Sequence, residues 1–285
     1  MGLMLIVVAC YTVCSLSDKY AVAKLKLSGN QLTWIMAAAT ALFMLVYLPF
    51  DSRLFTLSWQ SFAAIGLMTL SKLFEFKLAA VVLVEMSAFE LKAWLGITVF
   101  LSYITDIVSK NAVLGWNTPV QLAFIAVTAV GLFLIAKSGG EKIQYKKIAL
   151  PLGAYLLVKY GYGLIVNLTK SYISPSFSLF WALVILAICL APAVHPIKLF
   201  KEKPKGSAIV ALTKIPNVIG LVLENIVAVQ SMANYSFIQP LILAALFFIG
   251  LIRKEKATKL NIIGGIVCIF GVIGFQVIDM LSKTI

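Results

Sequence analysis

Long apolar runs separated by short polar segments form the main pattern of this chain. About ten runs are present, each of roughly 17–25 residues, which is the length a helix needs to cross a hydrocarbon core of ~30 Å. They lie at residues 2–25, 31–50, 60–82, 85–108, 118–137, 148–169, 177–194, 207–226, 230–252 and 260–281. Backbone groups in lipid must bond within their own segment, and no alternation with period 2 is visible. We therefore predict an all-α integral membrane protein with about ten transmembrane helices.

The composition excludes most classes of soluble protein. Of the 285 residues, 61% are hydrophobic and 12% are charged, whereas a soluble domain is about half apolar and about a quarter charged. The net charge of +13 would indicate a nucleic-acid partner in a soluble protein, but here the basic residues gather in short loops. One histidine and four cysteines fit no zinc spacing, and no nucleotide loop or nucleophilic triad is visible. We expect no enzyme activity, no metal, no cofactor and no nucleic acid.

A weak internal repeat divides the chain into halves. Residues 21–34 can be aligned with residues 165–181, about five runs further on. An odd number of crossings gives the two copies opposite orientations in the membrane. We predict two inverted five-helix repeats, residues 1–140 and 141–285, with a binding site where they meet, as in many secondary transporters.

Several short segments in the second half resemble a known transporter family. They are residues 238–241 (IQPL), 250–255 (GLIRKE) and 261–265 (NIIGG), followed by Gly271 and Gly274. In these segments the chain resembles the EamA-like, ten-helix members of the drug/metabolite transporter superfamily. The resemblance implies a carrier in the cell membrane, with cytoplasmic termini and a central cavity lined by residues early in the fourth helix. The first half departs from the family pattern, because Trp94 stands where a proline is expected.

Charged side chains inside the apolar runs are the strongest functional signal. Each costs about 2.5–3.5 kcal/mol at a helix centre, so it needs a partner or an aqueous cavity. Lys72 and Glu75 are three residues apart and can pair on one helix face. The pair either neutralises itself permanently or is opened by a substrate or a proton during a transport cycle.

The sixth run carries the most regular polar stripe. Tyr155, Lys159 and Tyr162 stand at i, i+4 and i+7, so they share one helix face. A lysine beside two phenols is suited to gripping an anion. The alternative is a buried lysine neutralised by a carboxylate on a neighbouring helix. In the first run, Asp18 either forms a polar rim on the same cavity or marks the end of the helix.

The fourth run offers two candidate stripes. Glu90 and Lys92 are about 200° apart around a helix, so they cannot both face one narrow cavity. Lys92 shares a face with Glu85 and Phe89, whereas Glu90 shares a face with Trp94. We predict that one of these stripes lines the cavity, and the choice between them stays open.

The eighth run places Lys214, Asn217 and Glu224 along one face. Pro216 is expected to bend the start of this helix, because it removes a backbone hydrogen bond. Glu224 lies near the far end of the run, where it is either a site residue or an interfacial one.

The last run is rich in glycine. Such residues let transmembrane helices approach closely, and a phosphate-binding loop would need a preceding strand. We therefore assign close helix packing to Gly264, Gly265, Gly271 and Gly274.

These observations predict a secondary-active transporter that exposes a central site to each side of the membrane in turn. The expected cargo is a small polar organic metabolite with a carboxylate or phosphate group, gripped by Lys159. Glu75 or Glu90 would bind an amine group or a proton. The expected partners are this small-molecule substrate, the lipid bilayer, and a coupled proton or sodium ion. The alternative function is a lipid-carrier flippase, or an accessory membrane subunit of an envelope pathway.

Basic residues are divided unevenly between the two sides of the predicted membrane. The odd-numbered connections carry Lys24, Lys26, Lys137, Lys142, Lys146, Lys147, Lys198, Lys201, Lys203, Lys205, Arg253, Lys254, Lys256 and Lys259. The even-numbered connections and the C-terminus carry Arg53, Lys110, Lys170 and Lys283. The positive-inside rule then places both termini outside a plasma membrane. The family resemblance implies the opposite, and we follow the charge distribution.

A cysteine at position 283 tests this orientation. In a variant whose four native cysteines are replaced, Lys283→Cys should react with a membrane-impermeant maleimide added to intact cells. Reaction only after the membrane is opened would place the termini in the cytoplasm.

Overall fold

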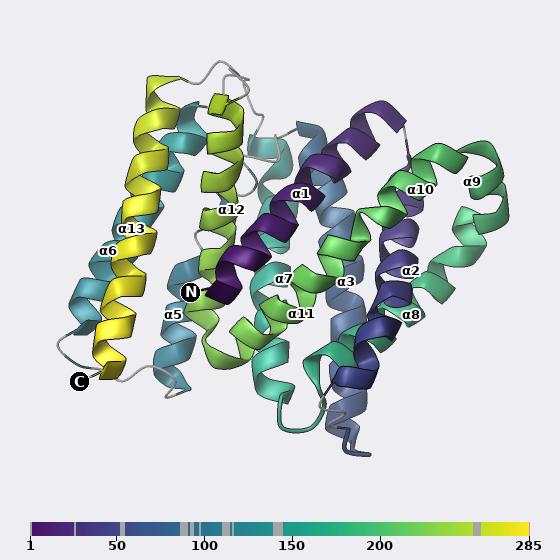
Figure 1. Ribbon diagram of the computed structural model, residues 1–285, viewed down its shortest axis with the longest axis horizontal. Helices are drawn as coiled ribbons and strands as arrows, with labels where there is room; N and C mark the ends of the chain where they lie inside the picture. Colours follow the sequence, from purple (N-terminus) through teal and green to yellow (C-terminus); the bar gives the residue numbers. More distant parts are fainter. Residues whose placement is uncertain are drawn as a thin grey trace.

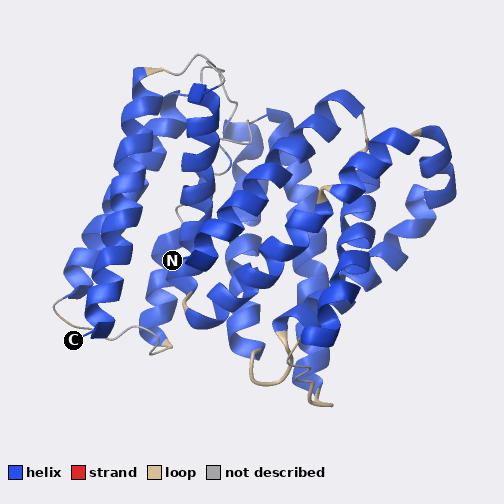
Figure 2. Ribbon diagram, viewed as in Figure 1, coloured by secondary structure: helices blue, strands red, loops and turns tan. Residues whose placement is uncertain are grey.

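A computed structural model describes residues 2–25, 27–51, 55–85, 91, 94–96, 98–109, 115, 117–138, 145–252 and 258–284. These residues are almost entirely helical, and the β-structure among them is one isolated bridge between Phe55 and Ile173 (Figures 1 and 2). The helices are α1 (Gly2–Leu25), α2 (Gly29–Tyr47), η1 (Leu48–Phe50), α3 (Trp59–Glu85), α5 (Thr98–Val108), α6 (Asn117–Ser138), α7 (Tyr145–Thr169), α8 (Pro175–Val194), α9 (Pro196–Glu202), α10 (Pro204–Leu212), α11 (Lys214–Gln230), α12 (Met232–Ile252) and α13 (Lys259–Thr284).

Seven described segments are long and apolar enough to cross a membrane. They are α2 continued by η1, α6, α7, α8, α10 together with α11, α12, and α13. The apolar part of α1 and all of α5 are shorter, and α3 carries Lys72, Glu75 and Lys77 near its middle. The all-α multi-pass class is therefore confirmed. The finer expectation of ten spans in two inverted repeats stays a prediction, and the expected boundary at residues 140 and 141 lies outside the described residues.

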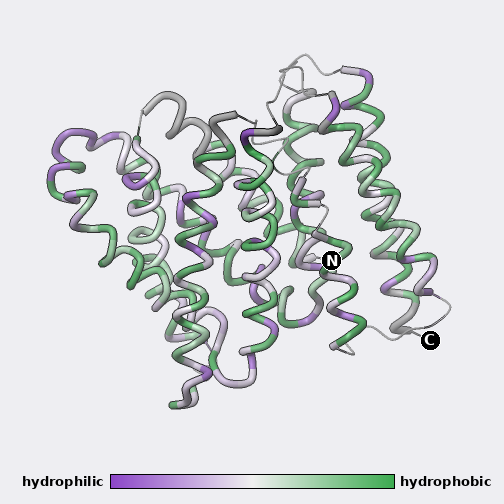
Figure 3. Tube along the Cα trace, turned by 180° about the vertical axis from the view of Figure 1, so that it is seen from behind, coloured by the Kyte–Doolittle hydropathy of each residue, from purple (hydrophilic) through white to green (hydrophobic). Residues whose placement is uncertain are grey.

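Apart from the polar residues buried inside the bundle, hydrophilic side chains lie mostly at helix ends and in one short helix (Figure 3). Figure 3 shows apolar residues along most of the helix lengths and a hydrophilic turn at α9. The sequence pattern predicted this region only as a connection. In the structure His195 adopts a left-handed conformation with φ of 49°, which ends α8 and lets Pro196 begin α9.

The eighth predicted span is broken. The break lies at Thr213 between α10 and α11, in the turn before Pro216, where a proline removes a backbone hydrogen bond. The carbonyl of Thr213 accepts a hydrogen bond from the Cys14 thiol of α1 at 3.4 Å. A neighbouring helix thus satisfies backbone that the break releases, as interrupted transmembrane helices require.

A buried carboxylate fixes the junction between α11 and α12. Ser231 alone separates these helices, so the very short connection predicted there is confirmed. The carboxylate of Asp106 in α5 accepts hydrogen bonds from Ser231 Oγ and from the backbone N–H groups of Met232 and Ala233, each at 2.8 Å. A negative charge at a helix N-terminus satisfies otherwise unpaired donors and complements the helix dipole. Asp106 therefore anchors α12 to α5.

Three of the four glycines predicted to pack closely, Gly264, Gly271 and Gly274, lie between α13 and α6, which run side by side at one edge of the molecule (Figure 1), whereas Gly265 faces Phe247 of α12. A Cβ added at Gly271 would lie 2.3 Å from Thr128 Oγ1 and 2.7 Å from its backbone nitrogen. One added at Gly131 would lie 2.5 Å from the backbone nitrogen of Cys268. The two backbones are therefore in contact at positions where only glycine fits.

Adding one methyl group at this seam should weaken it. We expect Gly271→Ala to lower the free energy of unfolding by about 1–3 kcal/mol, because the facing backbone cannot move aside. Gly161→Ala in α7 is the matched control, since its Cβ would meet nothing within 4 Å. Its effect should be under about 1 kcal/mol and stabilising. Thermal unfolding in detergent measures both, and equal effects would contradict the close contact.

Candidate functional site

Four charged side chains from three helices meet inside the bundle. We call Lys72 and Glu75 of α3, Lys159 of α7 and Glu224 of α11 the ionic cluster. All four are buried. Lys72 is thirteen residues from each end of α3, so it lies at the middle of that helix.

Lys159 is the centre of the ionic cluster. Its ammonium lies 3.2 Å from Glu75 Oε1 and 3.4 Å from Glu224 Oε1. The other oxygen of Glu75 accepts from Lys72 Nζ at 2.8 Å. One lysine thus joins a carboxylate from each half of the chain. Because α3 and α7 pack extensively against each other, these residues have a fixed place in the bundle.

Tyr11 of α1 completes the surroundings of Glu224. Its hydroxyl donates to Glu224 Oε2, so both oxygens of this carboxylate have partners. The tyrosine ring fits against α11 at Gly220, where an added Cβ would lie 2.8 Å from ring atom Cε1. A glycine one helical turn before Glu224 therefore gives the ring its access to the carboxylate.

Two further tyrosines support the lysines. The Tyr162 ring lies below Lys72 Nζ, with 4.1 Å between the nitrogen and the ring centroid, and 5.8 Å from Lys159 Nζ. An ammonium over an aromatic face is stabilised by the ring quadrupole, more so away from water. The Tyr162 hydroxyl donates to Asn225 Oδ1 at 2.9 Å, and the Tyr235 hydroxyl of α12 donates to the carbonyl of Lys159 at 3.0 Å.

The ionic cluster is formally neutral, with two ammonium and two carboxylate groups. Burying one unpaired ion costs several kcal/mol, and a network repays this only when the remaining lone pairs also have partners. Here all four carboxylate oxygens have a partner. The geometry allows exchange: an anion arriving at Lys159 could replace a carboxylate, and a proton on Glu224 or Glu75 would release the lysine.

The structure brings together four of the sequence-predicted residues as an ion-paired group, and Tyr162 with them. The Lys72–Glu75 pair is confirmed as a contact, and for Lys159 the alternative of a neighbouring carboxylate is the one observed. Glu224 is 0% exposed. It does not lie at the end of its helix as the predicted span implied, because α11 continues to Gln230.

Other predicted residues make no ion pair with the cluster. Tyr155 is buried one helical turn before Lys159, in an apolar cluster with Leu152 against which Trp94 also packs. Asn217 donates its amide to Thr40 Oγ1 of α2 at 3.4 Å. Lys214 is fully buried at the start of α11, two turns and more before Glu224.

Three predicted residues fall where the structure gives no side-chain description. Asp18 lies in α1, but its side chain is outside the described part of the chain, and Glu90 and Lys92 lie outside it entirely. The choice between the two stripes of the fourth run therefore stays open. Among the described residues, no group of three His, Cys, Asp or Glu side chains could hold a metal ion.

Sequence reasoning missed Tyr11 and Asn225 as partners of this region, and Asp106 as the anchor of α12. Tyr11 and Glu224 are 213 residues apart, and no spacing rule connects them. The one local signal was Gly220, a small residue one turn before a buried carboxylate.

Comparison with known proteins establishes the fold alone. No protein-family model matches the chain, and no curated protein matches it in sequence. Solved structures do match: one crystal structure of a protein superposes with a TM-score of 0.66 at 14% identity. The match covers 99% of this chain and 96% of the other. This chain is therefore similar in fold to that protein over nearly its whole length.

Unbalancing the ionic cluster should destabilise the protein. Glu224→Gln leaves two ammonium groups with one carboxylate, which should lower the free energy of unfolding by roughly 3–5 kcal/mol. Adding Lys159→Met restores neutrality around the Lys72–Glu75 pair, so the double variant should regain about half of that loss.

The matched control is Lys198→Ala in the exposed Lys198–Glu202 pair, whose side chains are 72% and 55% exposed. It should change stability by under about 1 kcal/mol. Thermal unfolding in detergent compares the variants. An effect of Glu224→Gln no larger than that of Lys198→Ala would contradict the buried network.

Proposed function

We propose that this protein is a secondary-active transporter of a small polar organic metabolite that carries a carboxylate or phosphate group. The observation that carries the proposal is the ionic cluster, in which Lys159 is held by Glu75 and Glu224 inside an apolar bundle. Ionisable residues kept at membrane depth mark solute or ion pathways, because apolar packing would serve stability as well. Lys159 would bind the anionic group, and Glu75 or Glu224 would take an amine group or a coupled proton.

The pattern of helix contacts supports two inverted five-helix repeats. Under such a repeat α1 corresponds to α7, and α3 corresponds to α11. The contact between α1 and α11 is then the symmetry equivalent of the contact between α7 and α3, and both contacts are present. The contacts α2–α8, α5–α12 and α6–α13 likewise join each helix to its expected counterpart. The ionic cluster lies between the α1–α11 and α3–α7 pairs, where transporters of this plan bind their cargo.

The interrupted span supports the same proposal. Broken helices next to a binding site let one segment tilt without the other, and their free backbone groups can serve a solute. The break at Thr213 separates α10 from α11, the helix that carries Glu224. The segments at residues 238–255 and 261–274 are the basis for proposing membership of the EamA-like transporters.

An alternative is a flippase for an anionic lipid carrier, or an accessory subunit of an envelope pathway. The observation that favours it is the basic segment of α9 and the start of α10, with Lys198, Lys201 and Lys205 exposed at one end of the bundle. Basic residues at that level attract anionic headgroups. Translocation of a fluorescent anionic lipid in liposomes, without uptake of any soluble solute, would favour this alternative.

Transport by purified protein in proteoliposomes tests the proposal. We expect uptake or exchange of at least one solute from a panel of organic acids, amino acids, sugar phosphates and amines. Lys159→Met should lower the rate about tenfold or more, because a charge-assisted bond of about 1.5–3 kcal/mol is lost. Lys159→Arg keeps the charge and should retain part of the activity.

Lys198→Ala is the control for these measurements and should transport normally. Variants are compared only where they purify as a single species. Absence of transport for the whole panel, or equal rates in Lys159→Met and wild type, would overturn the proposal.

A further inference from the structure

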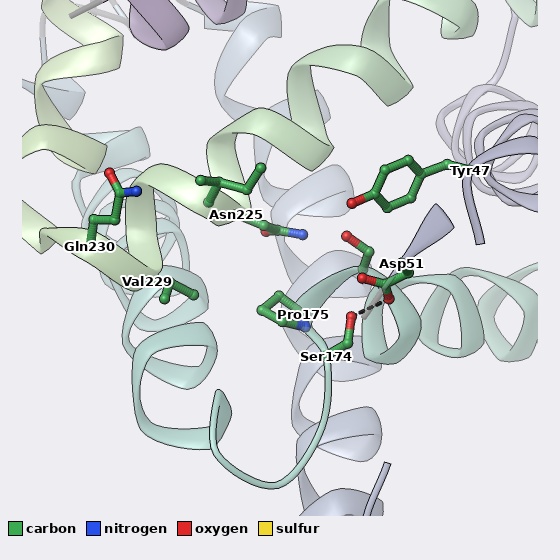
Figure 4. Close-up of a pocket in the computed structure, with 9 residues that line it drawn as sticks. Tyr47, Asp51, Ser174, Pro175, Asn225, Val229 and Gln230 are labelled. Atoms are coloured by element: carbon green, nitrogen blue, oxygen red, sulfur yellow. Dashed lines mark hydrogen bonds between the residues drawn. The ribbon is translucent and has the colours of Figure 1, made fainter. Parts of the chain in front are cut away.

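A pocket of about 290 Å³ lies between the ends of three helices, apart from the ionic cluster. Its walls come from the end of α2 and η1, the start of α8, and the last turns of α11 (Figure 4). Its nine lining residues are Tyr47, Asp51, Ser174, Pro175, Ser176, Asn225, Ile226, Val229 and Gln230. The volume is near the lower limit of small-molecule sites, so it suits a solute of few heavy atoms.

Asn225 presents a hydrogen-bond donor to this pocket. The residue is 1% exposed, and its Oδ1 accepts from Tyr162. Its Nδ2 has no hydrogen-bond partner among the described residues. Leaving a buried amide donor without a hydrogen bond costs about 1–3 kcal/mol. In Figure 4 the amide points to the side of the pocket where Tyr47 and Asp51 lie. The unused donor is therefore placed to receive an acceptor from a bound molecule.

The pocket wall that faces Asn225 carries a negatively charged hydrogen-bond acceptor, Asp51. Among the described lining residues Asp51 is the one with a charged side chain. Its carboxylate accepts a hydrogen bond from the Ser174 hydroxyl, drawn as a dashed line in Figure 4. Ser174 also caps α8, since its Oγ accepts from the backbone N–H of Phe177 at 3.4 Å. A carboxylate offers about four acceptor positions, so Asp51 can hold this bond and bind an ammonium group as well.

We propose that this pocket binds a small zwitterion, with its ammonium group at Asp51 and its carboxylate at the Asn225 amide. A simple anion would meet the charge of Asp51, and a simple amine would leave Asn225 unpaired. The two groups together select a solute that carries both charges.

The pocket deepens the proposed function, on which it rests, because it would be the first binding position on the path to Lys159. Asn225 belongs to both places: it lines the pocket, follows Glu224 in α11, and holds the Tyr162 ring that lies under Lys72. A carboxylate bound at the Asn225 amide is thus connected to the ionic cluster through Asn225 and Tyr162. If the solute carboxylate then replaces Glu75 or Glu224 as the partner of Lys159, the solute moves further into the bundle.

Equilibrium binding of L-serine to the full chain in detergent tests the proposal. Acetate and methylammonium, each with one of the two groups, should bind about tenfold more weakly or not at all. O-phosphoethanolamine represents a lipid headgroup. Asp51→Asn keeps an acceptor for Ser174 but removes the charge, and it should weaken L-serine binding about tenfold or more. Glu202→Gln, an exposed carboxylate of α9, should leave binding unchanged.

Asn225→Asp is the second variant, because it keeps the acceptor for Tyr162 and removes the donor. It should also weaken L-serine binding. Unchanged binding in Asp51→Asn, or binding of O-phosphoethanolamine alone, would overturn the zwitterion pocket. If Lys159→Met abolishes both binding and transport while Asp51→Asn alters neither, the pocket is wrong and the transporter proposal stands. Failure of every solute to bind or move overturns both.

Discussion

An ammonium group buried in an apolar bundle loses most of its hydration, and Lys159 therefore depends on Glu75 and Glu224. Much of the surrounding structure follows from this requirement. Glu75 comes on the same helix face as Lys72, and Glu224 receives Tyr11 through the space left by Gly220. The network brings α1, α3, α7 and α11 to one point. Removing one charged member leaves the two ammonium and two carboxylate groups of the cluster unbalanced.

Such a network is a poor way to gain stability. Well-packed apolar side chains of similar volume would hold the same helices together at least as well. The seam between α6 and α13 shows that this chain can pack helices without ions, since glycine backbones meet there directly. The molecule thus combines a rigid apolar edge with a polar interior whose partners can exchange. That contrast is the physical basis for proposing a moving interior and a transported solute.

The pocket at Asp51 also bears on orientation. It lies at the end of the bundle where α2 ends, α8 begins and α11 meets α12, which is the end with few basic residues. The charge distribution places this end on the outer side of the plasma membrane, so the pocket would receive solute from outside the cell. Cytoplasmic termini, as the family resemblance implies, would make the same pocket face the cell interior. The side of the membrane from which the pocket receives its solute therefore depends on the orientation of the chain.

The sequence alone determined the helical class, most helix positions and the presence of buried charges, because these depend on hydropathy and local spacing. The Lys72–Glu75 pair and the glycine packing were also predictable, since their partners follow from helix periodicity. Only the tertiary structure decided which carboxylates hold Lys159, that Glu224 is buried, and that Asn217 bonds to Thr40 of α2. The anchoring of α12 by Asp106 was equally invisible beforehand, whereas Pro216 had indicated a distortion near the break at Thr213. These features depend on contacts between residues far apart in the chain, and periodicity says which face a residue occupies but not which helix that face meets.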